Sequence, residues 1–119
     1  MVMYSFVCYR IINTSSIEAF CGFGTMNAYA ARNGAIIGFT RALATYLIPK
    51  SIRVNAVAPV AIYTPIQVDT REAQQMEGWG HKAGLGRPGE LSEVATSFVF
   101  LARADASLYW ASAALLPTW

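Results

Sequence analysis

Residues 52–59 read IRVNAVAP. This short run is rich in Val and Ala, is interrupted by single polar residues at Arg53 and Asn55, and ends at Pro59, which cannot donate to a sheet ladder. Such a run is typical of a parallel strand that is buried on both faces, because helices cover both sides of a parallel sheet. It therefore predicts a central strand in an α/β fold.

A long helix is predicted directly before this strand, over residues 27–48. Its apolar residues recur at helical spacing at Ala28, Ala31, Ala35, Phe39, Ala42 or Leu43, and Tyr46, and Pro49 ends the helix. Ile36 and Ile37 widen this stripe. A helix that is apolar on more than one side has to bury both, so we expect one face on the sheet and the other on a neighbouring subunit.

A further strand is predicted before the helix, over residues 4–13, which are rich in Val, Ile, Phe and Tyr. It ends at Thr14-Ser15-Ser16, so it brings hydroxyl groups to the carboxyl end of the sheet. Strand, helix and strand in this order imply a right-handed crossover.

The remaining residues continue the alternation of helix and strand within one domain, residues 1–119. Residues 60–89 are rich in loop-forming residues and are expected to form a mobile flap with a short helix at about 65–77. The next helix begins with Glu90 and Glu93, whose charges favour its positive end. Its apolar stripe is Leu91, Val94, Ala95, Phe98 and Leu101 or Ala102, and it is expected to end near Arg103. A last strand is expected within residues 108–116.

The composition argues against several classes of function. Nine basic residues against seven acidic ones give a net charge of +2, and the basic residues are scattered singly, which does not favour nucleic-acid binding. The uncharged runs are too interrupted to span a membrane, and the first residues do not resemble a secretory signal. Cys8 and Cys21 lack a disulfide or metal-ligand pattern, and His81 has no ligand partners nearby in sequence. We expect no metal site and a cytoplasmic location.

Several motifs occur in a fixed order along the chain: NTSS at 13–16, YAARNGA at 29–35, GFTRALA at 38–44, IRVNAVAP at 52–59, GRPGE at 86–90 and EVATSFVFLA at 93–102. Together they resemble the second half of a short-chain dehydrogenase/reductase. AIYTPI at 61–66 and the segment after residue 86 are most similar to glucose and ribitol dehydrogenase-like members. The resemblance implies a doubly wound, Rossmann-like parallel sheet, NAD or NADP as cofactor, and dimers or tetramers formed through the tyrosine-bearing helix.

The resemblance also assigns roles to residues. Reduction of a carbonyl needs a proton at the carbonyl oxygen, which Tyr29 would donate while the hydroxyl of Ser16 holds that oxygen. The family's lysine, four residues after the tyrosine, is Asn33 here, so no ammonium favours the phenolate or holds the nicotinamide ribose. Arg32 either leans towards Tyr29 or remains a solvated surface charge.

By motif position, the predicted cofactor-binding residues are Asn33, Pro59, Ile62 and Thr64. Two family glycines are replaced, one by Val60 and one, near the last strand, by Ser112. No Gly-rich turn that could seat a pyrophosphate precedes residue 11, and the GFG run at 22–24 lacks the rest of a nucleotide-binding fingerprint. We therefore expect a partial fold that lacks its N-terminal nucleotide-binding half, with weak or lost binding of NAD or NADP.

Three interpretations of function follow. The first is an NAD(P)-dependent oxidoreductase by descent that interconverts small-molecule alcohols and carbonyls but is inactive as this isolated chain. The second is a non-catalytic pseudoenzyme that forms a homo-oligomer or associates with a related subunit. The third is a truncated product without an independent function.

Overall fold

The computed structural model describes residues 9–22, 24–70, 72–81 and 83–115. Three strands form one sheet in the order β1-β2-β3, with β1 at Arg10–Thr14, β2 at Arg53–Ala58 and β3 at Ala113–Leu115. Both pairings are parallel, and the register places Ile12 opposite Asn55 and Val57 opposite Ala114. The predicted α/β class with a parallel sheet is confirmed.

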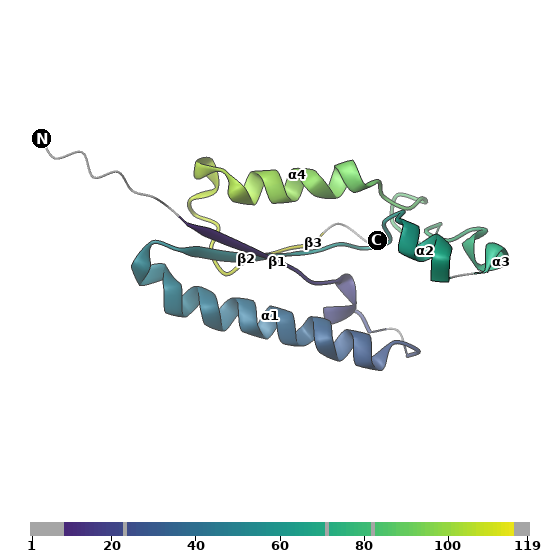
Figure 1. Ribbon diagram of the computed structural model, residues 1–119, viewed down its shortest axis with the longest axis horizontal. Helices are drawn as coiled ribbons and strands as arrows, with labels where there is room; N and C mark the ends of the chain where they lie inside the picture. Colours follow the sequence, from purple (N-terminus) through teal and green to yellow (C-terminus); the bar gives the residue numbers. More distant parts are fainter. Residues whose placement is uncertain (1–8, 23, 71, 82, 116–119) are drawn as a thin grey trace, which may run out of the picture.

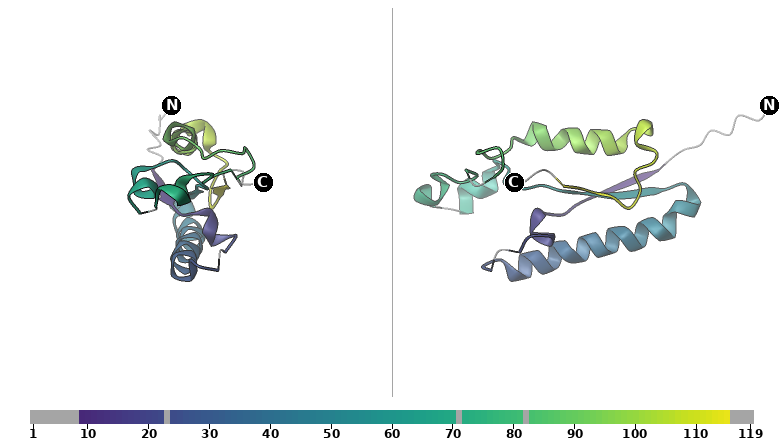
Figure 2. Two further views of the ribbon diagram at one scale, coloured as in Figure 1. Left: turned by 90° about the vertical axis from the view of Figure 1, so that its right-hand side faces the viewer. Right: turned by 180° about the vertical axis from the view of Figure 1, so that it is seen from behind.

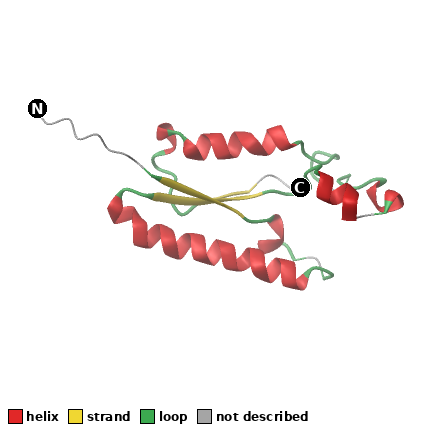
Figure 3. Ribbon diagram, viewed as in Figure 1, coloured by secondary structure: helices red, strands yellow, loops and turns green. Residues whose placement is uncertain are grey.

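The sheet lies between two helices (Figures 1 and 2). Helix α1, Asn27–Leu47, covers one face, and helix α4, Leu91–Ala102, covers the other. Two short helices, α2 at Pro65–Thr70 and α3 at Ala73–Met76, lie beyond the end at which β2 finishes (Figure 3). Single 3₁₀ turns, η1 at Ile17–Ala19, η2 at Ile48–Lys50 and η3 at Ala104–Ala106, follow β1, α1 and α4. The short helices and 3₁₀ turns of the described chain therefore lie at the two ends of the strands.

Most element boundaries agree with the sequence. The helix predicted over 27–48 is α1, and Pro49 lies in η2 immediately after it. The single helix predicted over 65–77 is instead two, α2 and α3. β1 is described only from Arg10, since residues 4–8 of the predicted strand lie outside the described residues. β3 begins later than predicted, because residues 107–108 form a turn, and Ala111 and Ser112 already exchange backbone bonds with β2 just before it. Residue 116 of the predicted strand lies outside the described residues.

The structure shows which side of α1 faces the sheet, a point that the sequence left open. The residues buried on the sheet side are Asn33, Ile37, Thr40 and Ala44. Two of these are polar. Asn13 Nδ2 of β1 donates to Thr40 Oγ1 at 2.9 Å, and Ser15 Oγ, just after β1, donates to the backbone carbonyl of Asn33 at 3.0 Å. The predicted stripe lies on the opposite side of the helix, where Phe39 and Tyr46 are 58% and 66% exposed. One face of α1 thus packs on the sheet, as expected, and the predicted apolar stripe belongs to the other, exposed face, whose contact with a neighbouring subunit stays a prediction.

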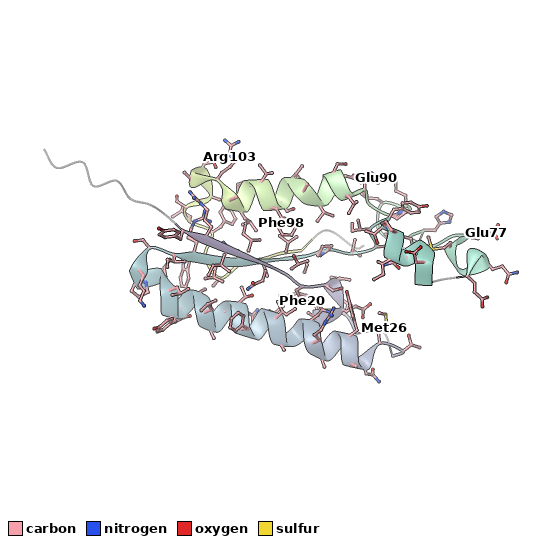
Figure 4. All side chains as sticks on the ribbon, viewed as in Figure 1. Phe20, Met26, Glu77, Glu90, Phe98 and Arg103 are labelled. Atoms are coloured by element: carbon pink, nitrogen blue, oxygen red, sulfur yellow. The ribbon has the colours of Figure 1, made fainter. Side chains whose placement is uncertain are left out.

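β2 is buried along its whole length. Val57 forms the centre of the core with Val94 and Leu101 of α4, and Phe98 packs against this cluster from the same helix (Figure 4). Burial of these side chains removes apolar surface from water, which is the main driving force for folding. The α4 face of the sheet therefore carries the apolar core.

The two polar residues of β2 organise the segment between α4 and β3. Arg53 donates from Nη2 to the carbonyls of Leu101 and Arg103, both at 3.0 Å, and from Nη1 to the Tyr109 carbonyl at 3.2 Å. Asn55 donates to the same Tyr109 carbonyl at 2.9 Å and accepts from the backbone N–H of Ser112 at 3.0 Å. A buried cation at the carboxyl end of a helix is favoured by the helix dipole. These bonds hold the last turn of α4 and the start of β3 against the central strand.

The backbone position near β3 that favours glycine is Ala111, one residue before the Ser112 that the resemblance aligned with the family's glycine. Ala111 has φ 57°, in the left-handed region, whereas Ser112 is not among the residues with positive φ. We predict that Ala111→Gly raises the free energy of unfolding by about 1 kcal/mol, since it removes the steric cost of a Cβ in this conformation. Denaturant unfolding measures this, with Ser112→Gly as the matched control. A stabilisation by the control that equals that of Ala111→Gly would contradict the assignment.

Candidate active site

Ser16 lies just beyond β1, where two backbone bonds keep the chain beside β2. Ser15 N donates to the Val57 carbonyl at 2.8 Å, and Ile17 N donates to the Pro59 carbonyl at 3.1 Å. Ser16 is the N-cap of η1, and its hydroxyl accepts from the backbone N–H of Glu18 at 3.3 Å. A hydroxyl that accepts one bond can still donate its own proton. The capping bond of Ser16 and its predicted role at a carbonyl oxygen are therefore compatible.

Tyr29 lies in the first turn of α1 and is 37% exposed. The guanidinium carbon of Arg32 lies 4.8 Å from the centroid of its ring. Arg32 thus leans over the ring of Tyr29 as a cation–π partner while its side chain remains exposed to solvent, so each of the two alternatives holds in part. The cation stands over the ring face, which orients the side chain.

Asn33 is 2% exposed, and its side-chain amide donates to the Tyr29 carbonyl at 2.8 Å, within the same helix. Its own carbonyl accepts the hydroxyl proton of Ser15. The Ser15–Asn33 bond therefore joins the segment that carries Ser16 to the helical turn that runs from Tyr29 to Asn33. The role of Ser15 in this bond was not predicted, although its hydroxyl next to that of Ser16 at the end of the predicted strand indicated it.

The other predicted cofactor residues follow β2. Pro59 lies beside η1 through its bond to Ile17, and so belongs to the same edge as Ser16. Ile62 forms an isolated parallel bridge with Gly89. Thr64 precedes α2, and its carbonyl accepts from Gln67 N at 3.0 Å. The structure thus brings Pro59 to Ser16, whereas Ile62 belongs to a second cluster.

That second cluster surrounds a cavity of about 180 Å³. It is lined by Val60, Ile62, Ala83, Leu85, Arg87, Gly89 and Glu93. A Cβ at Gly89 would come within 2.8 Å of Ile62 Cδ1, so the end of that side chain would have to shift to admit one. Neither Ser16 nor Tyr29 lines the cavity, so it is a separate feature from the predicted catalytic pair.

Arg87 and Glu93 form the polar rim of the cavity. Two guanidinium nitrogens of Arg87 donate to the two carboxylate oxygens of Glu93, each at 2.8 Å. Glu93 also accepts from the backbone N–H of Glu90 at 2.7 Å, so the prediction that this acidic pair marks a helix start is confirmed. The bond from Arg87, followed by that from the Glu90 backbone, lowers the pKa of Glu93 to about 2.

Within the described residues, no group of three or more His, Cys, Asp or Glu side chains could hold a metal ion. Nor does any helix in this part of the chain have the length and apolarity to cross a bilayer.

Comparison with known proteins agrees with this geometry. A family model described as enoyl-(acyl carrier protein) reductase matches residues 8–114. The chain belongs to the short-chain dehydrogenase/reductase family. Among solved short-chain dehydrogenases, the ligand-free aldohexose dehydrogenase of Thermoplasma acidophilum superposes with a TM-score of 0.82 at 30% identity, over 90% of this chain and 46% of that one.

Two plant relatives show the extent of the match. The chain is 50% identical over 97 residues to a glucose and ribitol dehydrogenase homolog of Oryza sativa subsp. japonica, which is 82% of this chain and 32% of the relative. It is 41% identical over 107 residues to NADPH-dependent aldehyde reductase 1, chloroplastic, of Arabidopsis thaliana, which is 90% of this chain and 37% of the relative. The chain thus spans about a third of the length of these short-chain dehydrogenases.

The Arg87–Glu93 pair predicts a pH-dependent stability. The pKa of Glu93 falls from its ordinary 4.5 to about 2 on folding, so its ionised form contributes stability above pH 4.5 that is lost as the pH falls to 2. Glu93→Gln should therefore lower the unfolding temperature at pH 7, and the difference from the unmodified chain should shrink between pH 4.5 and 2. Glu77→Gln, on the turn after α3 (Figure 4), is the control. A difference that does not change with pH would contradict this account.

Proposed function

We propose that this chain provides the substrate-facing part of an NAD(P)-dependent oxidoreductase that interconverts a small-molecule alcohol and a carbonyl. The observation that supports it most directly is the buried Ser15–Asn33 bond, which ties the Ser16 segment to the turn of α1 that carries Tyr29. Both predicted catalytic residues therefore belong to one end of the sheet. The relatives named as dehydrogenases and an aldehyde reductase support the same reaction class.

In this proposal each residue has a distinct role. Ser16 donates its hydroxyl proton in a hydrogen bond to the carbonyl oxygen of the substrate, while its lone pairs retain the Glu18 N–H. Tyr29 transfers a proton to that oxygen in the direction of reduction and takes it back in the direction of oxidation. Arg32 keeps the phenol ring in place.

The residues present do not fit the dinucleotide. Asn33 stands where the family resemblance puts a ribose-binding lysine, but its side chain is buried and its amide is bonded to its own helix. Val60 places a branched side chain where the resemblance expects glycine, and that side chain lines the cavity after β2. We therefore propose that the 119 residues alone bind NAD or NADP weakly or not at all, and that they are inactive alone. A cytoplasmic location belongs to the same proposal.

Asn33→Lys should restore little turnover by itself. A lysine at a position that is 2% exposed has to extend past its neighbours before its ammonium can contact a cofactor. It also adds no binding site for the pyrophosphate. We expect reduced-cofactor fluorescence titrations and assays with glucose or ribitol to stay at background for both the unmodified chain and the variant. Saturable binding and turnover by either chain on its own would overturn the proposal.

A second candidate function, association, is favoured by the exposed face of α1. Phe39 and Tyr46 project from it, opposite the buried residues, and an exposed apolar face of this kind is typical of protein interfaces. We propose that copies of this chain, or a related subunit, pack on this face.

Phe39→Glu should weaken self-association by at least tenfold, because it places a charge in the centre of the apolar face. Sedimentation equilibrium over a range of concentrations measures this. Arg41→Glu, on the same helix but outside this face, is the control and should change association little. A chain that stays monomeric at every concentration would exclude a homo-oligomer.

A further inference from the structure

The three strands begin at the end of the sheet that is opposite Ser16, and several segments meet there. η2 comes directly before β2, and the chain that follows α4 turns into β3 at the same end (Figures 1 and 2). Arg53 N donates to the Tyr9 carbonyl at 3.1 Å, and Arg53 Nη1 donates to the Tyr109 carbonyl at 3.2 Å. Residues 9–10, 48–53 and 103–112 therefore form one surface, which we call the amino edge.

The amino edge exposes large apolar side chains to water. Leu108, Tyr109 and Trp110 are consecutive in the segment that leads into β3, and they are 88%, 48% and 46% exposed. The backbone of this segment is held by the bonds that the Tyr109 carbonyl accepts from Arg53 and Asn55. The position of the segment is therefore fixed by the central strand, although its side chains remain exposed.

Cations that are far apart in the sequence come together at the amino edge. Arg10 begins β1, Lys50 ends η2 and Arg103 follows α4, and all three are exposed. Lys50 remains exposed although its ammonium lies 4.8 Å from the ring centroid of Tyr46. Arg103 pairs with Asp105 at 3.0 Å, and Asp105 is the one acidic residue of this edge. The exposed charged groups of the amino edge therefore carry a net charge of +2.

The other acidic residues lie at the opposite end of the strands. Figure 4 shows this division along α4, with Glu90 at one end of the helix and Arg103 at the other. Six of the seven acidic residues belong to segments at the carboxyl end of the strands, namely Glu18, Asp69, Glu72, Glu77, Glu90 and Glu93. The cations described at that end are Arg32 and Arg87. An anionic surface therefore attracts the amino edge and repels the other end of the sheet.

We propose that the amino edge binds to an anionic phospholipid surface. Leu108 and Trp110 enter the headgroup region, and Arg10 and Lys50 contact the lipid phosphates. Trp and Tyr rings are enriched at the boundary between lipid and water, and each cation close to an anionic leaflet adds to binding. A nucleic-acid strand also suits basic and aromatic residues, but it offers no apolar environment to Leu108. The lipid surface is therefore the partner that matches all of these side chains.

Binding at the amino edge leaves the candidate site accessible. Ser16 follows the carboxyl end of β1, and Tyr29 lies in the first turn of α1, at that same end of the sheet. The chain thus contacts the lipid with one end of its strands while the other end faces the solution. The proposal concerns binding alone, so it does not depend on the oxidoreductase assignment.

Co-sedimentation of the full chain with unilamellar vesicles tests the proposal. Vesicles of phosphatidylcholine mixed with phosphatidylserine should bind the chain about tenfold more tightly than vesicles of phosphatidylcholine alone, because only the former carry a negative charge. Added salt should weaken the binding to the mixed vesicles, since it screens the exposed cations. Equal binding to both kinds of vesicle, or binding to neither, would overturn the proposal.

Two matched leucine variants locate the binding surface. Leu108→Glu should weaken binding to the mixed vesicles about tenfold, because it places a carboxylate where an apolar side chain enters the lipid. Leu91→Glu makes the same change at the other end of α4 and should alter binding little. The two leucines are 88% and 58% exposed, so both variants should keep the circular dichroism spectrum of the unmodified chain. An equal loss of binding in the two variants would contradict the assignment to the amino edge.

A second pair of variants tests the cations. Lys50→Gln should weaken binding to the mixed vesicles about fivefold, which is the contribution of one cation near an anionic leaflet. Arg32→Gln removes a charge at the opposite end of α1 and should leave this binding unchanged. A larger loss for Arg32→Gln than for Lys50→Gln would overturn the proposal.

Two further outcomes would assign the amino edge to another partner. Self-association without lipid that Leu108→Glu abolishes and Leu91→Glu does not would indicate a second copy of this chain. Binding of polyuridylate that is tighter than binding of the mixed vesicles would indicate a nucleic acid. Either result would overturn the proposal of a lipid surface.

Discussion

A strand buried on both faces has to find partners for its polar groups within the protein, and β2 imposes this constraint on the described part of the chain, where Arg53 Nε is the one buried side-chain atom left without a partner. The side chains and backbone of β2 are shielded from water, so the neighbouring segments have to supply their hydrogen-bond partners. Arg53 and Asn55 take theirs from the carbonyls and the N–H that follow α4, which fixes the start of β3. On the other side, β1 bonds to β2 as far as Ser15 and, through Ile17, to Pro59, which fixes η1 and with it Ser16. The candidate site is therefore positioned by the same ladder that holds the sheet together.

The sequence predicted those parts of the fold whose signal is local. The apolar run of residues 52–58 defines β2, Pro49 marks the end of α1, and the spacing of Glu90 and Glu93 predicts the start of α4. It could not orient α1, because the residues that face the sheet include Asn33 and Thr40. Thr40 accepts from Asn13, 27 residues away, and a pattern within one helix carries no information on such a pair. The amide of Asn33 instead finds its partner four residues away, in the Tyr29 carbonyl of the same helix. Burial of a polar residue is decided by its partner rather than by its own hydropathy.

The candidate site, like the fold, has some parts that the sequence predicts and others that it does not. The family resemblance places Ser16 at a strand end and Tyr29 at the start of the following helix, and the structure has both residues there, whereas their catalytic roles stay a prediction. The cavity of Val60, Ile62 and Leu85 was not predictable, because it forms where two loops meet across the bridge between Ile62 and Gly89. The contact of Arg32 with Tyr29 was foreseeable only as one of two alternatives, since a flexible side chain on a helix surface can be solvated or packed.

The hydrogen bond that Ser15 donates to residue 33 shows which properties depend on having asparagine at this position. Ser15 donates to the backbone carbonyl of Asn33, not to its side chain, so any residue at this position would accept it. The tie between the serine segment and the tyrosine turn therefore does not depend on asparagine. What asparagine changes is the side chain, which bonds to the Tyr29 carbonyl instead of presenting a charge outside the helix. The bond between the two segments is therefore independent of the side chain at position 33, because it uses the backbone carbonyl, whereas any charge at this position would belong to the side chain.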